Sequence, residues 1–163
     1  MTNKFRTAEI TPKLAEQDAA IEGLYLSAYP QKEIAEAKTL TRLSKSKAVY
    51  GAVACLDAEV IGFIVLLSSG ECADILEICV APFAQNNGIG KKLLTAAIEL
   101  SIAREQQKIT LEVAKDNAIA QQLYRRANFR EIGHREGYYQ RGVLQIDALV
   151  MEKHLPTVHS SKT

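Results

Sequence analysis

The sequence predicts a mixed α/β fold, with a mostly antiparallel sheet, one parallel pair of strands near its centre, and about four helices. Apolar runs rich in β-branched residues and segments with helical periodicity follow one another in the order β-α-α-β-β-β-α-β-α-β-β. Three consecutive strands joined by short turns are typical of an antiparallel meander. The next helix joins two strands, and such a connection favours a right-handed crossover between parallel neighbours.

The N-terminal part of the chain predicts one strand and two helices. A weakly patterned apolar stretch at 5–10 is the first strand. Thr11 and Pro12 are typical of a helix start, with Thr11 as the cap and Pro12 in the first turn. This helix runs up to an interruption at Pro30, and the second helix covers residues 31–43.

The rest of the chain alternates strands with two further helices. Turn residues bound each apolar run, which keeps the strands short. The expected strands lie at 49–56, 60–67, 75–80, 109–113, 129–138 and 143–154, and the expected helices start at Lys91 and at about Asn117, the second ending near Ala127. Residues 1–155 are therefore predicted to form a single domain, followed by a flexible polar tail at 156–163.

The composition excludes several classes of protein. The 163 residues carry 20 basic and 19 acidic side chains, and a formal charge of +1 gives no general attraction to nucleic acid or to an anionic membrane. No apolar run reaches the roughly 18 residues of a membrane span. The first residues lack the apolar centre of a signal peptide. We expect a cytoplasmic protein, and a monomer is favoured.

The cysteines and histidines show neither a disulfide nor a metal-binding pattern. Cys55, Cys72 and Cys79 are odd in number and contain no CxxC pair, which is typical of reduced thiols in the cytosol. The three histidines lack the spacing of metal ligands, so we expect no metal site.

A strand, a glycine-containing loop and a helix start follow one another within Ile75–Leu94. Gly88 and Gly90 would let a phosphate approach the backbone, and the first amides of a helix have no internal partner and carry partial positive charge. Lys91 and Lys92 add positive charge just inside the helix. The stretch therefore predicts an anion site, although a turn without a ligand has the same composition. Neither GxGxxG nor GxxxxGK[ST] is present, which disfavours a dinucleotide fold and a P-loop.

Two longer strings carry a family resemblance. The string V-x-P-x-x-Q-x-x-G-x-G resembles the pyrophosphate loop of the GNAT acetyltransferase superfamily, and residues 111–139 contain L-E-V-x-x-x-N-x-x-A-x-x-L-Y-x-x-x-x-F followed by R-x-x-Y-Y. The second string resembles the protein N-terminal acetyltransferases, most of all the bacterial ribosomal-protein alanine N-acetyltransferases of RimI type. The resemblance covers about residues 75–151 and implies the GNAT fold, with acetyl-CoA as cosubstrate. The matching loop residues are Val80, Pro82, Gln85, Gly88 and Gly90.

The resemblance assigns the catalytic roles to Glu112 and Tyr124. In the resembled family the glutamate accepts the proton of the acceptor amine, and the tyrosine gives a proton to the leaving CoA thiolate. These residue types suit the chemistry, because a carboxylate can take a proton and a phenol can donate one. Alternation along the strand directs Glu112 away from the side of Leu111 and Val113. A solvated strand glutamate and a core tyrosine are the alternatives.

The resemblance also assigns the residues that hold acetyl-CoA. The loop amides grip the pyrophosphate, backbone amides at the end of the strand 75–80 bind the thioester carbonyl, and Asn117 contacts the cofactor as well as capping its helix. A covalent role for Cys79 is disfavoured, because no histidine is placed to activate it and buried cysteine is usually a small hydrophobe. The expected cofactor-binding residues are Ile78, Cys79, Val80, Gln85, Asn86, Asn87, Gly88, Ile89, Gly90, Lys91 and Asn117.

The acceptor side is predicted at Tyr138, Tyr139 and Arg135, which border the peptide groove in the resembled family. Packing between strands is the alternative role of the tyrosines. Glu33 and Glu36, on the second predicted helix, could attract a cationic peptide terminus, but a solvated helix face is favoured for them.

Four residues depart from the family pattern. Asn86 and Asn87 replace basic residues of the loop, which weakens the expectation for CoA binding. Ala114 stands where the nearest relatives often carry arginine, which puts the exact peptide in doubt. Asn128 replaces a glycine before Phe129, where asparagine can still adopt a left-handed conformation.

The sequence thus predicts an acetyl-CoA-dependent N-acetyltransferase that acts by direct attack of a protein N-terminal α-amine in a ternary complex. The favoured acceptor is the N-terminal alanine of a small-subunit ribosomal protein. A relative that acetylates another amine and a silent acyl-CoA-binding domain remain alternatives. The silent domain is disfavoured, because a binding module needs neither Glu112 nor Tyr124.

Overall fold

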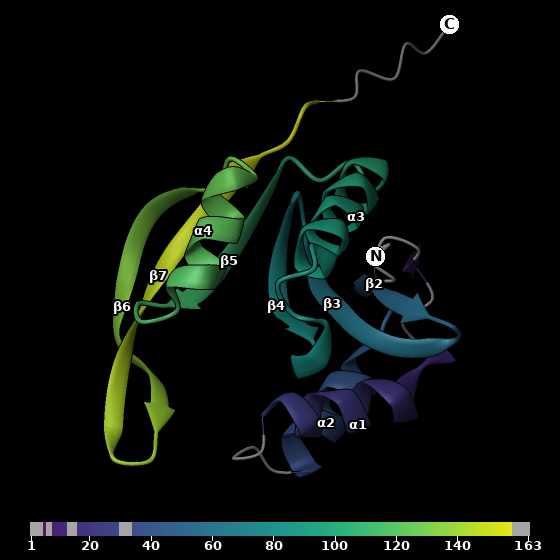
Figure 1. Cartoon of the computed structure of the whole chain (residues 1–163). Helices are drawn as coiled ribbons and strands as arrows, with labels where there is room; N and C mark the ends of the chain where they lie inside the picture. Colours follow the sequence, from purple (N-terminus) through teal and green to yellow (C-terminus); the bar gives the residue numbers. More distant parts are fainter. Residues whose placement is uncertain (1–4, 6–7, 13–15, 30–33, 158–163) are drawn as a thin grey trace, which may run out of the picture.

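A single seven-stranded sheet forms the centre of the molecule (Figure 1). A computed structural model describes residues 5, 8–12, 16–29 and 34–157 of the chain. In this part the strands lie in the order β1-β2-β3-β4-β5-β7-β6, and β4 and β5 are parallel whereas the other neighbours are antiparallel. The bounds are β1 Glu9–Thr11, β2 Val49–Leu56, β3 Glu59–Ser69, β4 Cys72–Val80, β5 Lys108–Ala114, β6 Arg130–Arg141 and β7 Leu144–His154.

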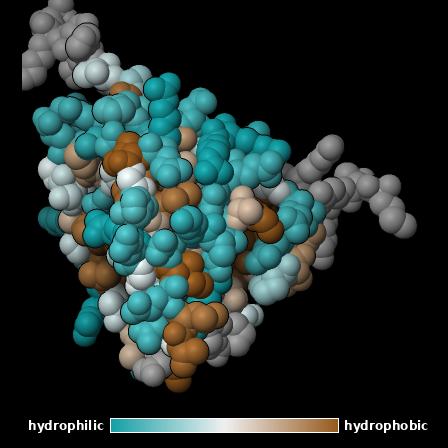
Figure 2. Space-filling model, turned by 90° about the vertical axis from the view of Figure 1, so that its left-hand side faces the viewer, coloured by the Kyte–Doolittle hydropathy of each residue, from teal (hydrophilic) through white to brown (hydrophobic). Residues whose placement is uncertain are grey.

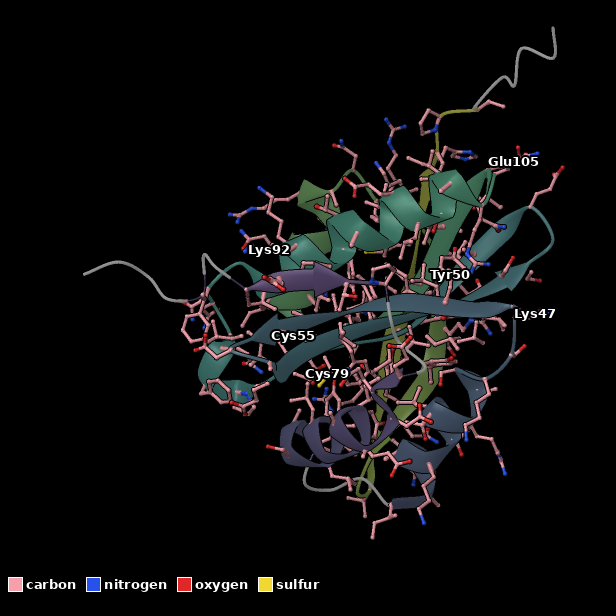
Figure 3. All side chains as sticks on the ribbon, turned by 90° about the vertical axis from the view of Figure 1, so that its right-hand side faces the viewer. Lys47, Tyr50, Cys55, Cys79, Lys92 and Glu105 are labelled. Atoms are coloured by element: carbon pink, nitrogen blue, oxygen red, sulfur yellow. The ribbon has the colours of Figure 1, made fainter. Side chains whose placement is uncertain are left out.

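Helices cover both faces of this sheet. Helices α1 (Asp18–Ala28) and α2 (Ile34–Leu43) lie on one face, and α3 (Ile89–Ala103) lies on the other (Figure 3). Helix α4 (Ala118–Arg126) lies beside the C-terminal strands, and a short 3-10 helix, η3 (Pro82–Ala84), follows β4. Because both faces are covered, β2 and β3 are buried on both sides, which explains their continuous apolar runs. No helix of the described part is long and apolar enough to span a membrane.

The predicted order of elements and the central parallel pair are confirmed. The prediction for the start of the chain is wrong in its bounds. Thr11 is the last residue of β1 and pairs with Val53, and α1 begins only at Asp18 with Gln17 at its N-cap, so Thr11 does not cap α1. Pairing in the sheet therefore overrides the local Thr-Pro signal. Three predictions lie outside the described residues: the interruption at Pro30, the helix start at 31–33, and the tail beyond Thr157.

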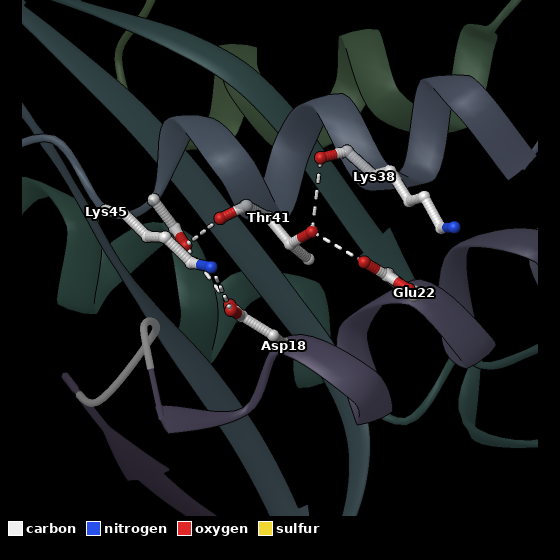
Figure 4. Close-up of polar contacts among 6 residues, drawn as sticks. Asp18, Glu22, Lys38, Thr41 and Lys45 are labelled. Carbon is white, nitrogen blue, oxygen red and sulfur yellow. Dashed lines mark hydrogen bonds and ion pairs between the residues drawn. The ribbon is translucent and has the colours of Figure 1, made fainter.

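Side-chain contacts hold α1 against α2 (Figure 4). The Thr41 hydroxyl donates to Glu22 Oε1 at 2.7 Å, and Ser44 Oγ donates to Asp18 Oδ1 at 3.2 Å. Lys45 adds an ion pair with Asp18 at 3.8 Å, which contributes little because it is exposed. The two helices therefore act as one unit, and α1 contacts β3 and β4.

Gly51 in β2 provides a test of the sheet packing. A Cβ there would lie 1.9 Å from the carbonyl oxygen of Ile64 in β3, so the backbone would have to move. We expect Gly51→Ala to lower the free energy of unfolding by about 1–3 kcal/mol or more in urea denaturation. Gly23 in α1 is the matched control, because a Cβ there meets nothing within 4 Å. Gly23→Ala should raise the free energy by about 0.5–1 kcal/mol, and equal effects of the two changes would contradict this packing.

Candidate active site

The strands β4 and β5 separate halfway along their length. Their ladder joins Cys72–Ile75 to Lys108–Leu111, although β4 continues to Val80 and β5 to Ala114 (Figure 1). Leu76 forms a bulge against β3, and a bulge bends its strand. Beyond Ile75 and Leu111 the two strands no longer pair with each other. We call this unpaired region the divergence of β4 and β5. Backbone amides at the end of β4 are therefore not used by β5.

The loop after β4 is shaped by its own side chains. Gln85 Nε2 donates to the Val80 oxygen at 3.1 Å, and Asn87 Nδ2 donates to the Gln85 oxygen at 2.8 Å. Asn86 has a φ of 61° and Gly88 one of 81°, both in the left-handed region. The side chains of Gln85 and Asn87 thus hold the loop through backbone oxygens, and the loop leads directly into α3.

Helix α3 begins at Ile89, two residues before the predicted start at Lys91. Gly88 is its cap, and the amide of Lys92 donates to the Gly88 oxygen at 3.1 Å. The amides of Ile89, Gly90 and Lys91 precede this first helical bond and carry the partial positive charge of the helix end. A Cβ on Gly88 would meet nothing within 4 Å, so the approach to these amides is open. This arrangement fits a pyrophosphate group.

The two lysines of the first turn of α3 differ in their surroundings. Lys91 is exposed. Lys92 Nζ donates to the Ala8 oxygen at 3.2 Å and to the Phe5 oxygen at 3.4 Å, and Figure 3 shows it beside β1. Lys92 Nζ thus contacts the N-terminal segment, and the prediction that both lysines add positive charge just inside the helix stays a prediction.

Glu112 in β5 has the orientation that alternation predicts. Leu111 and Val113 are 1% and 4% exposed, whereas the Glu112 side chain is 26% exposed. From β6, Arg135 Nη2 lies 3.1 Å from Glu112 Oε1. The Tyr139 hydroxyl donates to the Glu112 backbone oxygen at 3.0 Å. The fold thus brings the predicted proton acceptor together with two of the residues predicted for the acceptor side.

Helix α4 is fastened to the end of β5. Asn117 is its N-cap, as predicted, and its side chain accepts the amide of Ala120 at 3.1 Å. Gln121 Nε2 donates to the Ala114 oxygen at 3.1 Å. These contacts fix the helix with Tyr124 on its buried side. A Cβ on Gly90 would lie 3.4 Å from Leu123 Cδ2, so α4 also contacts the first turn of α3.

Tyr124 is 4% exposed and packs against Phe129, with ring centroids 5.8 Å apart. Asn128 sets the position of Phe129 with a φ of 64°, the left-handed conformation expected there. Burial, followed by the negative charge of Glu77, raises the pKa of the Tyr124 hydroxyl well above its usual value. The phenol therefore stays protonated at neutral pH and is able to donate a proton.

Tyr138 and Tyr139 form an aromatic group with Arg135 on β6. The two rings are 5.0 Å apart and nearly perpendicular, and the guanidinium lies 5.5 Å from the Tyr138 centroid. Burial is the main cause that raises the pKa of Tyr139 to about 12. Figure 2 faces the side of the molecule formed by β6, β7 and α4, and shows separate apolar patches there. The large apolar residues exposed on β6, β7 and their turn are Ile132, Tyr138, Val143 and Leu144.

The side chain of Cys79, in β4, is buried on the side of the sheet that α1 covers (Figure 3). Burial, followed by the charge of Glu77, raises the pKa of its thiol to about 12, so the thiol remains protonated and is a poor nucleophile. Among the described residues, no three His, Cys, Asp or Glu side chains are grouped as metal ligands.

Three residues at the divergence are not singled out by the sequence: Tyr25, Tyr29 and Glu77. The Tyr29 hydroxyl donates to Glu77 Oε1 at 3.0 Å. Two signals were available, because tyrosines four residues apart share a helix face, and Glu77 is a charged residue within the apolar run ILEICV. Glu36, predicted to be solvated, is exposed and also hydrogen-bonds Tyr25, while Glu33 lies outside the described residues.

Comparison with known proteins identifies related sequences. The sequence model of the Acetyltransferase (GNAT) family matches residues 13–129. A [ribosomal protein bS18]-alanine N-acetyltransferase of Haemophilus ducreyi is 38% identical over 80 residues, which is 49% of this chain and 55% of that protein. A mycothiol acetyltransferase of Clavibacter michiganensis is 39% identical over 75 residues, which is 46% of this chain and 24% of that protein. The matches thus span about half and about a quarter of these two relatives.

Solved structures show the same fold. The crystal structure of the ribosomal-protein-S18-alanine N-acetyltransferase from Escherichia coli superposes with a TM-score of 0.85 and 21% identity, over 96% of this chain and 99% of that one. The predicted GNAT fold is therefore confirmed.

Variants of Asn117 distinguish its role as the cap of α4 from a direct contact with acetyl-CoA. Asn117→Ala should lower the free energy of unfolding by about 1 kcal/mol, because the cap of α4 is lost. Asn117→Ser keeps a capping hydroxyl and should restore stability, yet bind acetyl-CoA more weakly than the parent in isothermal titration. Parental affinity in the serine variant would show that Asn117 acts only as a cap.

Proposed function

Because this chain belongs to the GNAT acetyltransferase family, we propose that it transfers an acetyl group from acetyl-CoA to the N-terminal α-amine of a protein. The observation that carries this proposal is the presence of Glu112 and Tyr124 at the divergence of β4 and β5, next to the open start of α3. The favoured acceptor is the N-terminal alanine of a small-subunit ribosomal protein. The names of two relatives similar to this chain support that choice.

The cosubstrate is proposed to lie between α3 and α4 with its thioester in the divergence. The amides of Ile89, Gly90 and Lys91 would hold the pyrophosphate, and Asn117 would contact the remainder of the molecule. Acetyl-CoA supplies an acetyl group activated as a thioester. Backbone amides of 78–80 would stabilise negative charge that develops on the carbonyl oxygen.

Proton transfer is assigned to two side chains. Glu112 takes a proton from the acceptor amine, directly or through water, so that the nitrogen can attack. Arg135, 3.1 Å away, orients the carboxylate. Tyr124, which burial keeps protonated, then hydrogen-bonds to the leaving sulfur or gives it the phenolic proton. The protonated thiol of Cys79 supports direct transfer without an acyl-enzyme.

The acceptor peptide is proposed to approach along β6. Tyr138 and Tyr139 offer aromatic surface there, and Arg135 links this surface to Glu112. We further propose that residues 1–155 act as one domain and as a monomer in the cytoplasm, where the three free thiols remain reduced.

Removal of either proton-transferring group tests the mechanism. Glu112→Gln and Tyr124→Phe keep nearly the same shape, and each should lower kcat by about 100-fold or more in steady-state assays. Glu131→Gln in β6 is the control and should leave kcat unchanged, because this glutamate is exposed and its ion pair in the described part of the chain is a 3.9 Å contact with Arg125. Unchanged acetylation in both site variants would show that the chemistry is assigned to the wrong residues.

A panel of acceptors tests the substrate class. The first set of acceptors consists of peptides that differ only in their first residue. The second set consists of the same peptides with a blocked α-amine and a free lysine side chain, and the third set consists of small amines. Each acceptor is incubated with acetyl-CoA. We expect acetylation of free α-amines, with alanine preferred, detected by mass spectrometry. A higher kcat/KM for lysine side chains or small amines would refute the proposed acceptor, and binding of acetyl-CoA without any turnover would indicate a silent domain.

A further inference from the structure

Strand β6 bulges where it passes Asp147 of β7. Residues 136–138 interrupt the ladder between Arg135 and Tyr139, and Asp147 lies opposite them. A bulge takes backbone groups out of the ladder, and these groups need other partners. The Gly137 amide donates to Asp147 Oδ1 at 3.1 Å, so a side chain of β7 closes the bulge in β6.

Asp147 is itself tied to the end of β5. Its backbone oxygen accepts the amide of Lys115, directly after the last residue of β5, at 2.9 Å, and Lys115 Nζ lies 3.6 Å from Oδ2. The hydrogen bond from Gly137 is the main cause that lowers the pKa of the Asp147 carboxyl. The group is therefore ionised at neutral pH, and an ionised acceptor forms the stronger hydrogen bond. Asp147 thus joins β5, β6 and β7 at the level of the bulge.

The two residues that flank the bulge both contact Glu112. Arg135 Nη2 lies 3.1 Å from its Oε1, and the Tyr139 hydroxyl donates to its backbone oxygen at 3.0 Å. The three side chains share one face of the sheet, because their partners in β7 are an even number of residues apart. Four residues of a regular strand span about 13 Å. The bulge holds Arg135 and Tyr139 opposite residues two apart in β7, a span of about 7 Å, which lets both reach one glutamate.

We propose that Asp147 is a positioning residue for acetyl transfer: by closing the bulge in β6, it holds Arg135 and Tyr139 against Glu112. Asp147 acts through these two residues, since its carboxylate contacts the backbone of the bulge. Tyr138 lies within the bulge and its ring is 5.0 Å from that of Tyr139, so the same contact shapes the aromatic surface proposed for the acceptor. This inference rests on the proposed function, in which Glu112 accepts the proton of the amine.

The test compares two substitutions of Asp147 in steady-state assays with the peptide acceptor. Asp147→Ala removes the hydrogen-bond acceptor and should lower kcat by about tenfold and raise the KM of the peptide. The KM of acetyl-CoA should not change, because the proposed pyrophosphate site lies in α3. Asp147→Asn keeps an oxygen that can accept the Gly137 amide, and should restore kcat to within about threefold of the parent. A parental kcat and peptide KM in Asp147→Ala would overturn the inference.

Lys115→Ala is the matched control for the charge of Asp147. It removes the ion pair and keeps the backbone amide that donates to Asp147. The lysine side chain is 65% exposed, so the pair contributes little, and the variant should have the kcat of the parent. A loss in Lys115→Ala as large as that in Asp147→Ala would show that the ion pair matters and the bulge does not.

A double-mutant cycle separates positioning from a general effect on the fold. Asp147→Ala is made in a protein that already carries Arg135→Gln and Tyr139→Phe. If Asp147 acts through these two residues, the added change should lower kcat by less than about twofold, because coupled residues are not additive. A further loss of about tenfold in this background would contradict a role through Arg135 and Tyr139.

Gly137→Ala disturbs the same hydrogen bond from the side of β6. Gly137 has a φ of 57°, which an alanine avoids, and a Cβ there would lie 3.1 Å from Gln145 Oε1. The bulge must therefore change shape, and the variant should show a lowered kcat with a parental KM for acetyl-CoA. If Asp147→Ala does not fold, Gly137→Ala decides alone, and a parental kcat there would refute the inference.

Failure of the proposed function is recognised separately through Glu112→Gln. If that variant is impaired while Asp147→Ala is parental, the proposed function stands and the positioning role fails. If Glu112→Gln has the parental kcat, the assignment of the proton acceptor fails, and the positioning role fails with it. If small amines are acetylated and peptides are not, the same comparison of kcat is made with the best small amine, and it decides in the same way.

Discussion

The separation of β4 from β5 beyond Ile75 and Leu111 is the constraint on which the rest of the site depends. A continuous ladder would consume the backbone groups of both strands and close the centre of the sheet. The sheet tolerates the separation because β3 still pairs with β4, and β7 still pairs with β5 along its whole length. The start of α3, the buried side of α4 and the end of α1 all meet this part of the molecule (Figure 1).

The chemistry of the site follows from an unequal distribution of charge. Glu112 lies 3.1 Å from Arg135, and Glu77, on another strand, accepts a hydrogen bond from Tyr29 at 3.0 Å. Burial keeps the nearby phenols protonated, including that of Tyr124. Proton acceptors and proton donors thus coexist in one site without a metal ion or a reactive thiol in the mechanism we propose.

Local patterns predicted the features that depend on nearby residues. The bounds of β2 and the cap at Asn117 are correct, because an apolar run and a capping side chain act over a few positions. Thr11 was misassigned, because its place is set by Val53, more than forty residues away. The meeting of Tyr29 with Glu77 depends in the same way on how α1 packs on β4. The catalytic roles of the predicted site residues stay predictions.

The central claim is that the two substrates meet at the divergence of β4 and β5. A crystal structure with a bisubstrate analogue, in which the α-nitrogen of an alanine peptide is joined to CoA, tests it most directly. We expect the pyrophosphate against the amides of Ile89–Lys91, with the joined nitrogen near Glu112 and Tyr124. An analogue that binds outside the divergence, or a joined nitrogen too far from Glu112 for a hydrogen bond either directly or through one water, would contradict it.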